Sequence, residues 1–264
     1  DKFYMNGMQL IDKNELVKAN IEFRNALQLN RKMTKAIWGQ VLVAEKQGKP
    51  GEQYKHLNAV LVNEPENLQA VVKLGRLLLL AGQLDKSLDK SEQAMKIDEH
   101  DLSALSLRAA VLLKLEDVEG AVALANKILT KDPVYIDALM ILATERMNTG
   151  NTQKAIEYLE RGLTKEPKNI GLLLFKIKAL ESINKVQLAE DILKSLINYY
   201  PDTATFKHML AQFYLKQNSG DKAEKIYRTI VENNPGDLKA KFKLVHFLNR
   251  IKGTDAGIKQ LHEF

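Results

Sequence analysis

The stretch IDALMILATERMNTGNTQKAIEYLERGLTKEPKN, residues 136–169, decides the fold. Its first part repeats apolar residues three and four positions apart, which is the spacing of one face of an α-helix. Asn-Thr-Gly-Asn at 148–151 interrupts this pattern, and a second helical pattern follows over 155–163. Pro167 ends the second pattern, because proline lacks a backbone N–H and disfavours a helical residue before it. The stretch therefore predicts two helices joined by a short turn.

The same pattern recurs every 34 residues along the chain. The prolines at 65, 133, 167, 201 and 235 lie on this period, with one vacancy at Glu99. A fixed period of this size is typical of stacked repeat arrays. The period divides the chain into repeats 1–33, 34–67, 68–101, 102–135, 136–169, 170–203 and 204–237 and a truncated repeat 238–264.

Two columns of small residues support this division. The twentieth residue of the successive repeats reads Ala19, Gln53, Ser87, Ala121, Ala155, Ala189, Ala223 and Gly257. The eighth residue reads Gly7, Val41, Gly75, Ala109, Ala143, Ile177, Ala211 and Val245. Small side chains in these columns let the two helices of a repeat approach closely, where larger ones would force them apart.

A 34-residue helix–turn–helix with these two columns and a closing proline resembles the tetratricopeptide repeat. The resemblance covers the whole chain and is closest at 151–167 and 220–235, whereas Arg108 and Glu116 stand where the family prefers Leu and Gly. It implies an all-α fold, a right-handed α-solenoid of antiparallel helix pairs with about seven to eight repeats in a single domain over residues 1–264. A β-sheet is not expected, because apolar and polar residues do not alternate with a period of two in this sequence. Pentatricopeptide repeats usually run at 35 residues without the proline, and HEAT repeats are longer.

Stacked repeats of this kind offer a long surface and no enclosed pocket, so the predicted function is a protein–protein interaction scaffold that binds a peptide or helical segment of a partner. In this family, defined positions of each first helix point into a concave groove. The resemblance gives Tyr4, Met8, Trp38, Leu42, Val72, Arg76, Leu79, Met140, Leu174, Lys178, His208, Phe242 and His246 as the candidate peptide-binding residues.

The stripe Trp38, Leu42, Val72 and Leu79 predicts an apolar binding surface, because aromatic side chains give a large contact area at low entropic cost. The alternative is that these residues pack between neighbouring repeats. Some family members grip a C-terminal carboxylate with Lys and Asn at the fifth and ninth positions of a repeat. Here those positions hold residues such as Trp38 and Leu42, so that mode is disfavoured.

The charge is concentrated in the last quarter, where residues 204–264 carry +5 of the total +6. Lys239, Lys241, Lys243, Arg250 and Lys252 are its densest cluster. Such a patch indicates nucleic-acid or other polyanion binding as an alternative function. The other interpretation of the patch is a solvated helix face, which makes nucleic acid the weaker alternative.

Few residues point to chemistry. The chain has no cysteine, its five histidines have no metal-binding spacing, and it has no Gly-rich phosphate loop or nucleophile elbow. His208 and His246 are expected on neighbouring first helices without a carboxylate partner. We therefore expect no enzyme, catalytic residue, metal site, cofactor or small-molecule substrate. The chain could also be the docking part of an enzyme whose catalytic segments lie elsewhere.

A narrower resemblance concerns residues 16–30, LVKANIEFRNALQLN, which are similar to a phrase of large bacterial tetratricopeptide lipoproteins of exopolysaccharide and PEP-CTERM sorting loci. It implies a segment of a longer periplasmic protein, tethered to the membrane through an anchor outside this chain, with an assembly role in the envelope. A cytoplasmic location is the alternative. Apolar residues at both ends, such as Met5 and Phe264, predict further repeats or end-to-end self-association.

Overall fold

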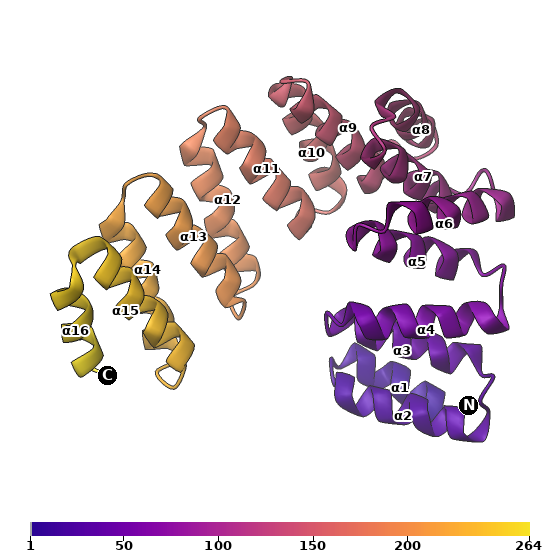
Figure 1. Cartoon of the computed structure of the whole chain (residues 1–264), viewed down its shortest axis with the longest axis horizontal. Coiled ribbons are helices and arrows are strands. Elements are labelled where there is room, and N and C mark those ends of the chain that lie inside the picture. The colour runs from indigo at the N-terminus through magenta and orange to yellow at the C-terminus, as the bar shows by residue number, and fades with distance from the viewer. Residues whose placement is uncertain (1) are drawn as a thin grey trace. The chain divides into compact units, whose positions relative to one another are not determined.

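The computed structural model describes residues 2–264, which form sixteen α-helices and no strand (Figure 1). The helices are α1 (Lys2–Asp12), α2 (Leu16–Leu29), α3 (Thr34–Lys46), α4 (Pro50–Asn63), α5 (Leu68–Leu80), α6 (Leu84–Ile97), α7 (Leu102–Lys114), α8 (Val118–Lys131), α9 (Ile136–Asn148), α10 (Thr152–Lys165), α11 (Ile170–Ser182), α12 (Val186–Tyr199), α13 (Ala204–Lys216), α14 (Gly220–Asn233), α15 (Leu238–Lys252) and α16 (Thr254–His262). None of the helices in this described range is long and apolar enough to cross a membrane.

The odd-numbered helices are called first helices below and the even-numbered ones second helices. Apart from α9 and α10, each first helix packs against the second helix that follows it. From α3 onward, every first helix begins at the first residue of a predicted repeat. The predicted all-α fold of repeated helix pairs is therefore confirmed. The chain divides into two compact units, of which unit 1 ends at Glu145 and unit 2 begins at Arg146, inside α9. The single domain expected over the whole chain stays a prediction.

The turn inside each helix pair has a left-handed residue at a fixed place. The fifteenth residue of seven successive repeats has positive φ, between 53° and 80°: Asn14, Gly48, Gly82, Glu116, Gly150, Asn184 and Asn218. Glycine and asparagine tolerate this region best, whereas other L-residues are strained there. Glu116, with φ 66°, is therefore the one unfavourable residue of this series.

The two columns of small residues lie at the closest helix contacts. Five alanines of the twentieth column are fully buried: Ala19, Ala121, Ala155, Ala189 and Ala223. In unit 1 the ring of Phe23, on α2, lies against α1 and α3. A Cβ added at Gly7 would be 2.6 Å from that ring, and a Cβ added at Gly39 would be 2.4 Å from it. The packing therefore requires glycine at both places.

The core of unit 1 consists of clusters that bridge successive helix pairs. One surrounds Phe23 and Ala36, the next surrounds Leu57 and Leu74, and a third surrounds Ala94. Each helix pair thus buries its apolar face against its neighbour, as expected for a repeat that cannot form a core alone.

Gly39→Ala tests the close packing. We expect a loss of about 1–3 kcal/mol in the free energy of unfolding, because the methyl group and the Phe23 ring cannot occupy the same space. Gly51→Ala is the matched control, since a Cβ there meets nothing within 4 Å. Chemical denaturation measures both variants, and equal stabilities would contradict the packing described here.

Glu116→Asn tests the left-handed turn. Asparagine occupies the equivalent position in three other repeats, so the change should raise the free energy of unfolding by about 0.5–1 kcal/mol. Asn184→Ala should lower it by a similar amount. A Glu116→Asn variant that melts below the unmodified protein would show that this turn is not strained.

Candidate functional site

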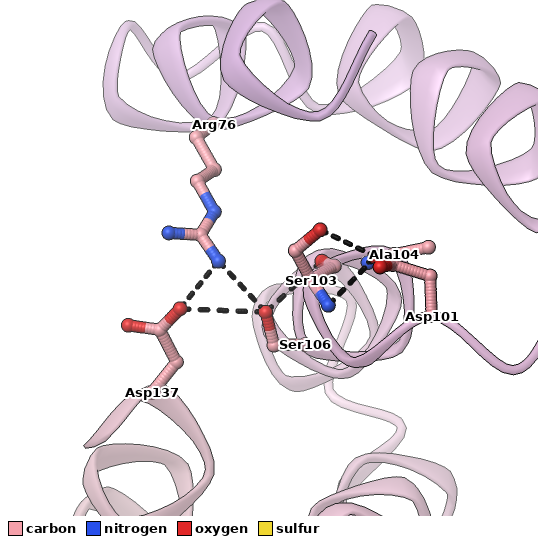
Figure 2. A network of polar contacts seen from close by, with 6 residues as sticks. All are labelled: Arg76, Asp101, Ser103, Ala104, Ser106 and Asp137. Carbon is pink, nitrogen blue, oxygen red and sulfur yellow. Dashed lines mark hydrogen bonds and ion pairs between the residues drawn. The ribbon is translucent and has the colours of Figure 1, made fainter. Parts of the chain in front are cut away.

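A polar network joins three successive first helices of unit 1 (Figure 2). Arg76 of α5 forms an ion pair with Asp137 of α9 and donates a hydrogen bond of 2.8 Å from Nη2 to Oγ of Ser106 on α7. Ser106 is only 1% exposed. Its single hydroxyl proton can go to the Ser103 carbonyl, 3.0 Å away, or to Asp137 Oδ2, 3.3 Å away. The predicted groove residue Arg76 is therefore already bound by its own chain.

Asp101 fixes the start of α7 beside this network. Its Oδ1 accepts hydrogen bonds from the backbone N–H groups of Ser103, at 2.9 Å, and Ala104, at 2.8 Å (Figure 2). This is the N-cap interaction that satisfies free donors at a helix start. It holds the first turn of α7, and with it Ser106, opposite Arg76.

A hollow of about 440 Å³ on unit 1 contains two of the predicted residues, Val72 and Arg76. Val72 is only 4% exposed. The second cation of this hollow, Lys73, pairs with Glu45 at 2.8 Å. Both cations are thus neutralised within unit 1, which leaves a polar hollow whose charges are compensated.

The apolar positions predicted for unit 1 pack mainly against its core. Tyr4, Met8 and Leu42 lie against the cluster around Phe23. Trp38 is half-buried against the cluster around Leu57, and Leu79 against the cluster around Ala94. These contacts are those of the packing alternative, so peptide binding by the Trp38 stripe stays a prediction.

Unit 2 has an open hollow of about 460 Å³, the α13–α15 hollow, on its first helices. Three predicted residues meet there: His208, Phe242 and His246. The other lining residues are Gln212, Leu215, Tyr227, Lys243, Phe247 and Arg250.

Aromatic rings form the apolar part of this hollow. Tyr227 lies 5.0 Å from Phe247 and 5.9 Å from the His208 ring, measured between ring centroids. Gln212 Nε2 lies 2.8 Å from Tyr227 Oη and donates a hydrogen bond to it. Phe242 is 63% exposed, although it is one of the largest apolar side chains. Phe242 therefore offers contact area that its own fold does not use.

The charges of the hollow are all of one sign. Lys243 and Arg250 line it, and in the part of the chain that the structure describes no Asp or Glu does so. Lys243 Nζ lies 3.2 Å from His208 Nε2, which accepts its hydrogen bond when the ring is neutral. Burial lowers the pKa of His208 below its ordinary value, and Lys243 lowers it further, while Asp237 opposes the shift. His208 is thus held in its neutral form near neutral pH.

A second hollow, of about 340 Å³, lies on the other side of α13 and is called the α11–α13 hollow. It shares the lining residues His208 and Gln212 with the first, so the two hollows adjoin at α13 and are together called the groove across α11, α13 and α15. Its lining acid, Glu181, is 3.5 Å from Lys216. The two ends of the groove therefore differ, with a compensated charge pair at α11 and uncompensated cations at α15.

Three predicted positions lie outside these hollows. Met140 and Leu174 are half-buried and Lys178 is exposed, and none of them lines the hollows described here. Two residues of these sites were not among those predicted from the sequence: Asp137, which pairs with Arg76, and Tyr227, which lies on a second helix. The sequence does indicate that Tyr227 is special. The same position holds apolar residues such as Phe23 in other repeats, so Tyr227 should be buried, and a buried tyrosine hydroxyl needs a hydrogen-bond partner.

Some cations of the basic cluster in the last quarter already contact other groups of the chain. Lys252 pairs with Glu224 at 2.5 Å, and Lys241 lies 4.9 Å from the centre of the Phe264 ring. Among residues 2–264, Lys239, Lys241, Lys243 and Arg250 enter no ion pair. Four of the five cations are thus not compensated by an acid, and the polyanion alternative stays a prediction.

Two other expectations concern metals and the chain ends. The described residues contain no group of three or more His, Asp or Glu that could hold a metal ion. At the ends, Met5 is 55% exposed, Ile258 48% and Leu261 50%. End-to-end self-association through these residues stays a prediction.

Residues 147–207 match a family model described as a tetratricopeptide repeat. These residues are therefore identified as tetratricopeptide repeats, and the helix pairs on either side of them have the same 34-residue period. A tetratricopeptide repeat protein from Parabacteroides merdae aligns over 93% of this chain and 97% of its own, with 16% identity and a TM-score of 0.62. Proteins of this fold are protein–protein interaction scaffolds and are generally not catalytic.

Two further proteins are similar over different lengths. PilF of Pseudomonas aeruginosa is 14% identical, covers 80% of this chain and 96% of its own, and has a TM-score of 0.55. BBS4 of Bos taurus, a BBSome complex member, is 31% identical over 101 residues, which are 38% of this chain. The chain spans about a fifth (19%) of the length of this curated relative.

The depressed pKa of His208 predicts a pH dependence of stability. As the pH falls through 6.5, the unfolded chain takes up a proton at His208 before the folded chain does. The free energy of unfolding therefore falls with pH, until the pH is below the depressed pKa. We expect the thermal midpoint to drop less between about pH 7.5 and about pH 5.5 in His208→Gln than in the unmodified protein.

His262→Gln is the control for this comparison, because His262 is an exposed histidine of the same unit. Its midpoint should follow that of the unmodified protein. An equal drop in the His208→Gln variant would contradict the assignment.

Proposed function

We propose that this protein is a non-enzymatic scaffold that holds a peptide or helical segment of a partner protein in the groove across α11, α13 and α15. The observation that carries the proposal is Phe242, which is 63% exposed at the mouth of a hollow with an aromatic wall. Large exposed aromatic side chains beside a concave surface are the usual anchors of binding. Its two adjoining hollows take their lining residues from three successive repeats, which suits an extended or helical segment.

Unit 1 is the weaker candidate for the same role. Its hollow has Arg76 and Lys73 paired with acids of the same unit, and its apolar positions belong to the core. A partner would have to displace those pairs before it gained their charges. Binding in unit 1 would thus recover less free energy from the same number of contacts.

Phe242→Ala tests this function. Peptides of about 12 random residues, displayed on phage, are first selected on the unmodified protein and then measured on the variants. We expect the affinity of the enriched peptides to fall about tenfold or more in Phe242→Ala, since truncation of an anchoring ring costs 1–2 kcal/mol or more.

Leu188→Ala is the matched control. Leu188 is 51% exposed and lies on the second helix α12 of the same unit. It should leave the affinity unchanged. Peptides that bind Phe242→Ala as tightly as the unmodified protein would rule out this groove as the binding site.

We also propose that the chain belongs to a membrane-tethered protein of the bacterial envelope, where it serves exopolysaccharide or other envelope assembly. The support is the similarity of residues 16–30 to lipoproteins of that kind. PilW, a type IV pilus biogenesis factor, has a related fold, with 16% identity and a TM-score of 0.59. Protease added to spheroplasts of the source cells should degrade the protein, whereas full protection by the intact inner membrane would place it in the cytoplasm.

A further inference from the structure

The α13–α15 hollow has a charge pattern that a specific kind of segment would complement. Lys243 and Arg250 are both exposed and lie seven residues apart on α15, which places them on one face of the helix two turns apart. His246 lies between them on the same face. This is a row of basic side chains along one wall of the hollow.

The apolar part of the hollow lies beside this row. Phe242 and Phe247 come from the same helix, and Tyr227 closes the wall from α14. An occupant therefore meets a cationic row and an aromatic surface together. Arg250 has no acid partner in the described part of the chain, and Lys243 contacts only a histidine nitrogen among polar groups. Their charge is available to a ligand, unlike that of Arg76 or Lys73 in unit 1.

We propose that the partner segment is an acidic protein segment, with side-chain carboxylates over Lys243 and Arg250 and a large apolar side chain against Phe242 and Phe247. This inference rests on the proposed function and names the chemistry of its partner. Two turns of helix separate the cations by about 10 Å, which a segment in the polyproline II conformation spans in about three residues, with the first and last side chains on one face. The preferred pattern is therefore two acids about three positions apart with an apolar residue between them.

The groove also gives the segment a direction. At α11 the hollow holds Glu181 near Lys216, so an additional carboxylate there would meet an acid as well as a base. At α15 it would meet cations alone. The acidic part of the segment thus lies along α15, and its less charged part turns from there toward α13 and α11.

The test starts from the phage-displayed library, in which each peptide is joined to the coat protein and has no free C-terminal carboxylate. The pool enriched on the unmodified protein should be rich in Asp and Glu spaced as described. One enriched peptide, synthesised with an amidated C-terminus, is then measured by fluorescence anisotropy. Lys243→Gln and Arg250→Gln should each weaken its binding about fivefold, and the losses should shrink at high salt.

Lys225→Gln is the matched control, because it removes one exposed positive charge from the second helix α14 of the same unit. It should change the affinity less than twofold. Arg250→Lys, which keeps the charge, should recover most of the affinity lost in Arg250→Gln. Thermal unfolding establishes that each variant is folded.

The remaining outcomes separate this inference from the proposed function. A pool that is enriched and depends on Phe242 but is not acidic, or that ignores Arg250→Gln, overturns the inference and leaves the proposed function standing. A pool that does not distinguish the unmodified protein from Phe242→Ala ends both. A polyuridine RNA of about 20 nucleotides that displaces the peptide more effectively than the unlabelled peptide does would also overturn the inference, in favour of a polyanion site.

Discussion

The close approach of helices at small residues is the constraint on which the rest of this structure depends. Phe23 fills the space that Gly7 and Gly39 leave open, and in the same way the Leu107 side chain lies where a Cβ of Gly75 would be. Repeated every 34 residues, such contacts determine which side of each helix is buried. They also determine which side of each first helix stays exposed and can contact a partner.

The two units use that remaining side differently. In unit 1 the side chains on the exposed side of the first helices already contact one another or the core. Arg76 binds Ser106 and Asp137, and Trp38 packs against the core. In unit 2, Phe242 is exposed and, in the described part of the chain, Arg250 has no ion-pair partner. Partly exposed ion pairs add little stability, so the network of unit 1 mainly positions its first helices and reduces the charge available to a partner.

Much of the fold could be predicted from the sequence, because the features that end and join helices are local. The period and the helix starts follow from Pro167 and the equivalent prolines of other repeats. Turn residues such as Gly150 and Asn184 indicate the same boundaries. The site could be predicted only in part. His208, Phe242 and His246 share one hollow because their positions repeat, but the pairing of Arg76 with Asp137 joins residues two repeats apart. Which long side chains meet depends on the stacking of helices, and the repeat pattern does not contain that information.

The central claim is that side chains of the first helices of unit 2, held in place by the packing beneath them, form a binding surface that is ready before the partner arrives. A titration of the isotopically labelled protein with an enriched peptide, followed by two-dimensional NMR of backbone amides, tests this most directly. The account predicts shifts confined to α11, α13, α15 and the Tyr227 region of α14, with little change in the buried second-helix residues. Shifts centred on unit 1, or spread through the core of unit 2, would contradict it.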